Sequence, residues 1–208
     1  MSEAPAPLAV GAVLFPGFEL LDVYGPLEML GMLGERARIT MLAERPGPIR
    51  SHQGPSTVAE AALADARGLD VLLVPGGMGT RREVANAPFL DELRRQAGSA
   101  RLVASVCTGS ALLARAGVLD GIGATSNKRA FSWVVSQGPR VRWIAQARWV
   151  EDGKFFTSSG VSAGMDMALG LIARTHGRET SIKIAQQAEY EWHQDKQWDP
   201  FARLSGLN

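Results

Sequence analysis

The chain has 208 residues, of which 46% are hydrophobic and 21% are charged, a composition typical of one ordinary globular domain. Its formal net charge of +1 gives no electrostatic argument for binding nucleic acid or an anionic membrane. A single cysteine excludes an intramolecular disulfide, no apolar run approaches the roughly 20 residues needed to cross a bilayer, and the N-terminus lacks a signal-peptide pattern, so we expect a cytoplasmic protein that spans no membrane.

Apolar strands and helices alternate through the first half of the chain. A run such as LAVGAVLF, apolar at every position, is typical of a parallel strand covered on both faces. We expect a loose tail over residues 1–7, strands over Leu8–Phe15, Arg38–Ala43 and Leu69–Val74, helices over Asp22–Leu33 and Pro88–Gln96, and a loop or small hairpin over Pro46–Val58.

The second half continues the alternation. We expect strands over Arg101–Ser105, Val141–Trp149 and Lys154–Ser158, a short extended piece over Gly123–Ser126, and helices over Gly109–Ala116, Lys128–Gln137, Ser162–Thr175 and Glu179–Trp192. The aromatic tail, residues 193–208, is expected to pack on the body or on a partner. The pattern predicts a single α/β domain over residues 1–208, a flavodoxin/Rossmann-like three-layer sandwich with a mostly parallel sheet.

The only cysteine lies between a predicted strand and a predicted helix. Cys107 and Thr108 occupy the tight turn, and Gly109 lets that turn close. A strand that runs directly into a helix forms a nucleophile elbow, which presents one side chain at the carboxyl edge of the sheet. The helix N-terminus favours thiolate over thiol. We therefore interpret Cys107 as an active-site residue rather than as a small buried apolar one.

Two other strand ends would bring polar groups to the same edge. Asp22 and Glu19 follow the first strand, and either carboxyl could exchange a proton with the thiol, although each is also explained as a solvated acid at a helix start. The glycines Gly76 to Gly79 follow the third strand, and their backbone N–H groups, with that of Thr108, could form an oxyanion hole. The alternative for these glycines is a sharp turn.

Histidine and metal chemistry have little support. We interpret each of the three histidines as a surface residue: His52 is in a loop, His176 is near a helix end and His193 is in the tail. No metal-ligand spacing is present, so we expect no metal and no cofactor. Possible pocket walls are Phe18, Met78, Phe131 and Trp133, and Trp192 and Trp198 could cover a dimer interface.

Several segments together resemble the ThiJ/PfpI superfamily, which has the class I glutamine amidotransferase-like fold. They are, in order, FPGFELLDVYGPLEML, LLVPGGMGT, ASVCTGSALLARAGVLDG, ATSNKRAF and FTSSGVSAGMDMALGLI, and the resemblance covers roughly Leu8 to Ala202. The L-D-x-x-G-P and C-T-G patterns are similar to those of the isonitrile hydratase-like branch. The resemblance implies Cys107 as nucleophile, Asp22 as its acidic partner, Thr108 as a neighbouring polar residue, Gly77 in the oxyanion hole with Met78 beside it, and a homodimer.

One segment departs from the protease, glyoxalase and deglycase branches of this superfamily. These branches usually carry a histidine just after the A-T that follows the elbow helix, whereas this chain reads Ala124-Thr125-Ser126. A glyoxalase or deglycase is therefore disfavoured.

The function that the resemblance implies is hydration of a small isonitrile to a formamide. The alternative is a cysteine-based redox sensor or small-ligand-binding protein. The superfamily also includes the ligand-sensing half of AraC-type regulators, but no helix-turn-helix follows here, so we expect no nucleic-acid binding.

Overall fold

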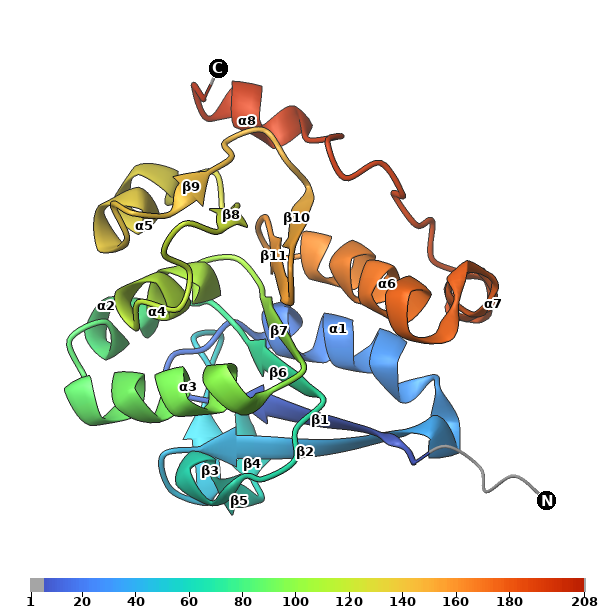
Figure 1. Cartoon of the computed structure of the whole chain (residues 1–208), viewed down its shortest axis with the longest axis horizontal. Coiled ribbons are helices and arrows are strands. Elements are labelled where there is room, and N and C mark those ends of the chain that lie inside the picture. The colour runs from blue at the N-terminus through green and yellow to red at the C-terminus, as the bar shows by residue number, and fades with distance from the viewer. Residues whose placement is uncertain (1–5, 208) are drawn as a thin grey trace.

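A computed structural model describes residues 6–207, and of the tail expected over 1–7, residues 1–5 lie outside the described part. Its centre is a seven-stranded sheet in the order β10-β11-β7-β6-β1-β2-β5 (Figure 1). Only β10 runs antiparallel to its neighbour, β11. The strands are β1 Leu8–Val13, β2 Ala37–Ala43, β5 Ala61–Ala62, β6 Val71–Val74, β7 Leu102–Ser105, β10 Trp149–Asp152 and β11 Phe155–Ser158.

Helices cover both faces of this sheet, which makes three layers (Figure 1). One face carries α1 (Leu20–Gly31), α6 (Ala163–His176) and α7 (Arg178–Gln187), and the other carries α2 (Thr80–Glu83), α3 (Ala87–Ser99) and α4 (Gly109–Arg115). Because both faces are covered, all four residues of β6 and all four of β7 are buried. The predicted three-layer α/β fold with a mostly parallel sheet is confirmed.

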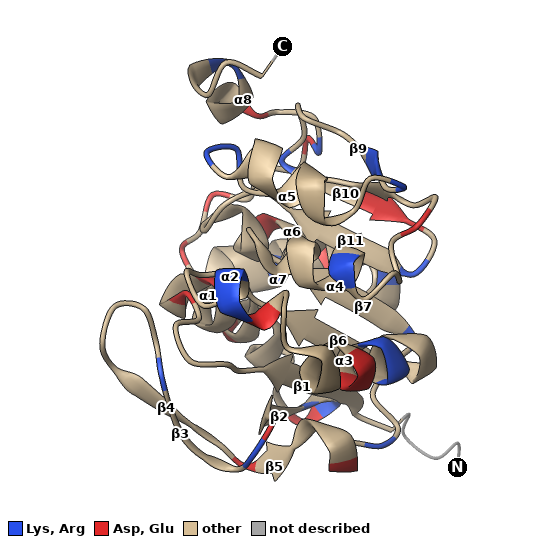
Figure 2. Ribbon diagram, turned by 90° about the vertical axis from the view of Figure 1, so that its left-hand side faces the viewer, with Lys and Arg blue, Asp and Glu red and all other residues tan. Residues whose placement is uncertain are grey.

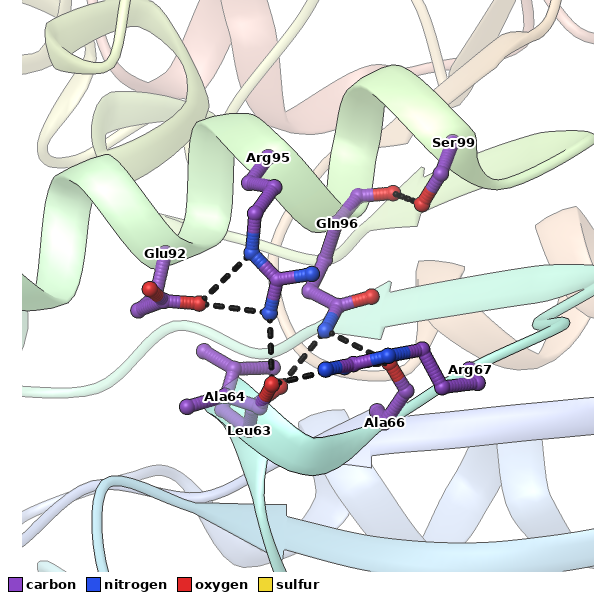
Figure 3. A network of polar contacts seen from close by, with 8 residues as sticks. All are labelled: Leu63, Ala64, Ala66, Arg67, Glu92, Arg95, Gln96 and Ser99. Carbon is purple, nitrogen blue, oxygen red and sulfur yellow. Dashed lines mark hydrogen bonds and ion pairs between the residues drawn. The ribbon is translucent and has the colours of Figure 1, made fainter.

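A polar network fixes α3 against the turn that leads into β6 (Figure 3). The buried Gln96 side chain donates to the carbonyl oxygens of Leu63 and Ala66, at 2.6 and 3.1 Å. Arg95 donates to the Ala64 carbonyl at 2.7 Å and also pairs with Glu92. These bonds satisfy carbonyls of the short 3-10 helix Leu63–Asp65 and so hold the entry to the central strands.

Small elements complete the chain. A two-stranded hairpin of β3 (Gly47–Arg50) and β4 (Ser56–Ala59) occupies the segment expected as a loop or hairpin. Gly34–Arg36 forms a 3-10 turn, β8 (Gly123–Ala124) pairs with β9 (Arg142–Trp143), and α5 (Phe131–Gln137) and α8 (Pro200–Leu204) are short helices. Within residues 6–207, no helix combines the length and apolarity needed to cross a membrane.

The strand predicted over Val141–Trp149 is wrong. Only Arg142–Trp143 forms a strand before β10 begins at Trp149. The backbone between them is used elsewhere: the Ala147 carbonyl accepts from the Lys128 ammonium at 2.9 Å, and the Arg148 N–H donates to the Lys196 carbonyl at 2.7 Å. Contacts with distant parts of the chain therefore replace the strand ladder there.

Two predicted helices are shorter than expected. The helix predicted from Lys128 begins at Phe131, since the Asn127 side chain accepts the Ala130 N–H at 3.0 Å and closes a turn instead. The helix predicted to reach Trp192 ends at Gln187, and Glu189 then adopts a left-handed conformation with φ of 49°.

The segment after α7 is tied to the body by two buried acids. Asp166 of α6 accepts from the Tyr190 hydroxyl and the His193 N–H, each at 3.0 Å, and forms an ion pair with Arg148 at 2.7 Å. Asp199 caps α8 through the Phe201 N–H and lies 3.0 Å from the buried Lys128 ammonium.

Candidate active site

Cys107 lies in a strained turn between β7 and α4. Its φ is 56°, a left-handed conformation that costs an L-residue about 1–3 kcal/mol and persists only where the surroundings impose it. Its N–H donates to the Ser159 carbonyl at 3.2 Å, and its carbonyl accepts from the Ser126 hydroxyl at 2.8 Å. A Cβ at Gly109 would lie 2.3 Å from the Val74 carbonyl oxygen, so only glycine fits there. The geometry is that of a nucleophile elbow.

Asp22 lies beneath this elbow. It is in the first turn of α1 and has no exposed surface, so its interpretation as a solvated helix-start acid is wrong. Its Oδ2 accepts the Gly76 N–H at 2.9 Å, whereas its buried Oδ1 has no hydrogen bond within residues 6–207. Burial raises the pKa of Asp22 well above its usual range, and the Glu19 charge adds to this, against the lowering effects of the Gly76 N–H and the Cys107 thiol.

Burial also raises the pKa of the Cys107 thiol, and the Asp22 carboxylate charge raises it further. The N–H groups of Thr108 and Val161 and the side chain of Asn127 oppose this rise without cancelling it. The Thr108 N–H at the start of α4 does favour the thiolate, as expected, but burial outweighs this effect and the pKa of the thiol rises. Simultaneous ionisation of Cys107 and Asp22 is therefore disfavoured.

The glycine turn after β6 packs directly on the elbow. A Cβ at Gly76 would lie 2.5 Å from the Thr108 nitrogen and 2.9 Å from Asp22 Oδ2. The Gly77 N–H donates to Thr108 Oγ1 at 3.1 Å, and Thr80 Oγ1 lies 3.2 Å from the same oxygen. The Gly77 N–H, expected as an oxyanion-hole donor, is thus already engaged by Thr108. The N–H groups that lower the pKa of the Cys107 thiol are those of Thr108 and Val161.

A cavity of about 410 Å³ lies over the sulfur. It brings together the predicted Cys107, Thr108, Gly77 and Met78, while Asp22 lies below its floor. Of the other predicted wall residues, Phe18 and Phe131 are buried in the core and Trp133 packs against Arg81. The full lining is Glu19, His52, Gly77, Met78, Arg81, Cys107, Thr108, Asn127, Arg129, Ala130 and Val161.

A second hollow of about 460 Å³ adjoins the first and shares Asn127, Arg129 and Val161 with it. Its apolar wall consists of Leu21 from α1 with Phe201 and Leu204 from α8. The C-terminal helix therefore lies next to the candidate site.

Sequence reasoning missed Asn127 and Val161. Val161 follows β11, the direct neighbour of β7, and its N–H lowers the pKa of the Cys107 thiol. The serines and glycine after that strand were a usable signal, but the strand order was not available from the sequence. Asn127 follows Ser126, which stands where related branches carry histidine and which holds the Cys107 carbonyl instead.

No histidine hydrogen-bonds to Cys107 or Asp22 among the side-chain contacts of residues 6–207. His52 is exposed and lines the cavity, His176 contacts the Thr175 hydroxyl at 2.9 Å, and His193 stacks on Trp198 with ring centroids 4.3 Å apart. The described residues also contain no cluster of three or more His, Cys, Asp or Glu arranged to hold a metal ion.

Comparison with known families matches the geometry. The profile of the DJ-1/PfpI family aligns with residues 9–174, which include the elbow, the glycine turn and Asp22. The chain belongs to the DJ-1/PfpI family. A solved ThiJ/PfpI family protein from Pseudomonas syringae superposes with a TM-score of 0.83 at 27% identity, covering 97% of this chain and 85% of that one.

Two curated relatives are similar in sequence. Isonitrile hydratase of Pseudomonas putida is 34% identical over 183 residues, which are 88% of this chain and 78% of that protein. The HTH-type transcriptional regulator GbdR of Pseudomonas aeruginosa is 33% identical over an alignment of 210 positions that covers 97% of this chain. The chain spans only 57% of the length of that regulator.

Proposed function

We propose that this DJ-1/PfpI protein hydrates an isonitrile to an N-substituted formamide, with Cys107 as the nucleophile and Asp22 as the proton carrier. The observation that carries the proposal is the fully buried Asp22 carboxyl beneath the elbow cysteine: among residues 6–207, its Oδ1 has no hydrogen-bond partner and the cysteine has no histidine partner. The 34% identity with the isonitrile hydratase of Pseudomonas putida supports the same reaction class.

The first step adds the thiol across the terminal carbon of the isonitrile. The sulfur of Cys107 bonds to that carbon, the carbon takes a proton from Asp22, and the thiol proton passes to Asp22 in its place. The product is a thioimidate, R–N=CH–S–Cys107. A raised Asp22 pKa suits this step, because the carboxyl must carry a proton at neutral pH in order to donate it.

The second step releases the product. The Asp22 proton passes to the thioimidate nitrogen as water adds to the carbon, and the resulting Asp22 carboxylate takes one proton from that water. The C–S bond then breaks while the hydroxyl proton of the tetrahedral intermediate passes to sulfur, which gives the formamide and the free thiol and leaves Asp22 protonated as at the start. The N–H groups of Thr108 and Val161 and the Asn127 side chain would stabilise negative charge on the departing sulfur. Thr108 Oγ1 would orient the water.

Incubation with cyclohexyl isocyanide, followed by mass spectrometry of the formamide, tests the proposal. We expect turnover by the wild type, none by Cys107→Ala, and a loss of about 10²- to 10⁴-fold in Asp22→Asn, which keeps an acceptor for the Gly76 N–H but cannot carry the proton. Glu19→Gln, which removes the other candidate acid, should reduce turnover far less.

Two results would contradict the mechanism. Full activity in Cys107→Ala would exclude covalent catalysis, and full activity in Asp22→Asn would exclude Asp22 as the proton carrier. A folded wild type that forms no formamide from a panel of alkyl and aryl isonitriles would exclude the reaction itself.

A second candidate is small-ligand binding without turnover, which the 33% identity with GbdR over 97% of this chain favours. The cavity over Cys107 would then hold the ligand. A redox sensor is less well supported, because sensor cysteines have a low thiol pKa and here burial raises it. Ligand-induced thermal stabilisation that is equal in wild type and Cys107→Ala, with no formamide, would favour the binding function.

The homodimer stays a prediction. Exposed apolar side chains on α1 and α8, namely Leu21, Tyr24, Phe201 and Leu204, supply surface for such an interface.

A further inference from the structure

Two guanidinium groups and one carboxylate line the cavity over Cys107. Arg81 comes from α2, and Arg129 comes from the turn before α5. Figure 2 shows the basic stretch of α2 in blue, beside α1. The carboxylate is that of Glu19, whose Oε1 already accepts from the Gln53 amide. The cavity wall therefore carries an excess of positive charge.

Neither guanidinium has an acidic partner within residues 6–207, although both face the same cavity. The neighbouring Arg82 differs, because it forms an ion pair with Glu83 and donates to the Pro16 carbonyl at 3.1 Å. Arg81 lies over the Trp133 ring of α5, 4.2 Å from its centroid. This stacking restricts the side chain while leaving its N–H donors free, so the group is positioned before any ligand binds.

We propose that Arg81 and Arg129 bind an oxyanion group of the substrate, in the first instance a carboxylate. A guanidinium presents paired N–H donors that match the two oxygens of a carboxylate. Two such groups, one from α2 and one from the turn before α5, would hold the carboxylate of the substrate away from its isonitrile carbon. The proposal rests on the proposed function for the reaction at Cys107. It adds the substrate class, an isonitrile that bears a carboxylate, where the reaction alone requires only the isonitrile carbon.

Alkylation of Cys107 tests the anion site without requiring catalysis. The Cys107 thiolate reacts with both iodoacetate, which is negatively charged, and iodoacetamide, which is neutral. Because both reactions use the same thiolate, the ratio of the two rates does not depend on how far the thiol is ionised. We expect Arg81→Gln and Arg129→Gln each to lower the iodoacetate-to-iodoacetamide ratio by about three- to tenfold, and the wild-type ratio to fall in high salt. Intact-mass spectrometry measures both rates.

Arg101→Gln is the matched control. It removes one arginine charge at the opposite end of β7, where Arg101 pairs with Asp70 and does not line the cavity. Its ratio should equal that of the wild type. Equal ratios in the wild type and both cavity variants would overturn the proposal. If Arg129→Gln does not fold, Arg81→Gln, at an exposed position of α2, still decides the question.

Substrate comparison separates this proposal from the hydratase proposal. We expect 4-isocyanobutanoate to have a KM about tenfold lower than its methyl ester, with similar kcat, and Arg81→Gln to abolish the difference. Turnover of both compounds with equal KM would overturn carboxylate recognition and leave the hydratase function intact. Turnover of neither, with an alkylation ratio that responds to both arginines, would overturn the hydratase function and support the anion site.

Discussion

The burial of Asp22 has a cost for stability that is separate from its part in chemistry. Its pKa is raised well above 3.8 in the folded protein, whereas an unfolded chain has the ordinary value. Below pH 3.8 both states carry the proton. As the pH rises from there, the unfolded state loses the proton while the folded state keeps it, so the free energy of unfolding falls until the pH passes the folded pKa.

Asp22→Asn should remove this loss. The variant cannot ionise at this position, so its stability relative to the wild type should rise with pH above about 4, by up to about 1.4 kcal/mol per pH unit until the folded pKa is reached. Urea denaturation between pH 4 and pH 8 measures the difference. Asp65→Asn, at an exposed acid of the 3-10 turn before β6, serves as the control. A wild-type minus Asp22→Asn difference that does not change with pH would contradict the raised pKa.

At the scale of elements, α8 is fixed beside the site by one buried ion pair. Lys128 and Asp199 have side chains that are only 2% and 1% exposed. Lys128 also donates to Thr125 Oγ1 at 2.7 Å, so the ion pair joins α8 to the turn that carries Asn127 and Arg129. Removal of one member of a buried pair leaves an uncompensated charge.

Asp199→Asn tests this pair while keeping the α8 cap, since asparagine caps a helix as well as aspartate does. We expect a loss of about 3–5 kcal/mol in the free energy of unfolding at neutral pH. Burial lowers the pKa of Lys128 and Asp199 opposes that effect, so without Asp199 the ammonium should lose its proton more easily. The destabilisation should therefore shrink as the pH rises.

The double variant Lys128→Met/Asp199→Asn provides the internal control for that measurement. Because it removes both charges, chemical denaturation should show a smaller loss than in Asp199→Asn alone. A double variant that loses as much stability as Asp199→Asn alone would show that the pair does not act through its charges.

At the scale of the whole molecule, Asp166 joins three distant parts of the chain. It binds Arg148 before β10 and the Tyr190 and His193 groups beyond α7, with no exposed surface of its own. Asp166→Asn should lower the free energy of unfolding by about 3–5 kcal/mol, because the Arg148 side chain is only 5% exposed and would lose its counter-charge.

Glu151 offers the comparison for that variant. It also ties the tail to the body, through Lys196 at 2.7 Å, but this pair lies partly in solvent. Glu151→Gln should therefore cost less than about 1 kcal/mol in the same denaturation experiment. Equal losses in the two variants would mean that burial does not decide the strength of these contacts.

The sheet was predictable from sequence because its strands are short apolar runs that glycine and proline end abruptly. Leu69–Val74 and Arg101–Ser105 were placed within two residues of β6 and β7, and the Cys107 turn followed from them. The segment Val141–Trp149 was misassigned, because its backbone bonds to Lys128 and Lys196, and such distant partners leave no local pattern. Val161 was missed for a similar reason, since only strand order brings it to the sulfur.

The placement of Cys107 at the cavity floor has a practical consequence. It is the chain's only cysteine, and only 7% of it is exposed, on the side that faces the cavity. Any thiol-specific reagent must pass through that cavity before it can react. A fluorophore or a spin label attached at this single position would thus report on the cavity alone, and its rate of attachment would measure how often the cavity admits a molecule of that size.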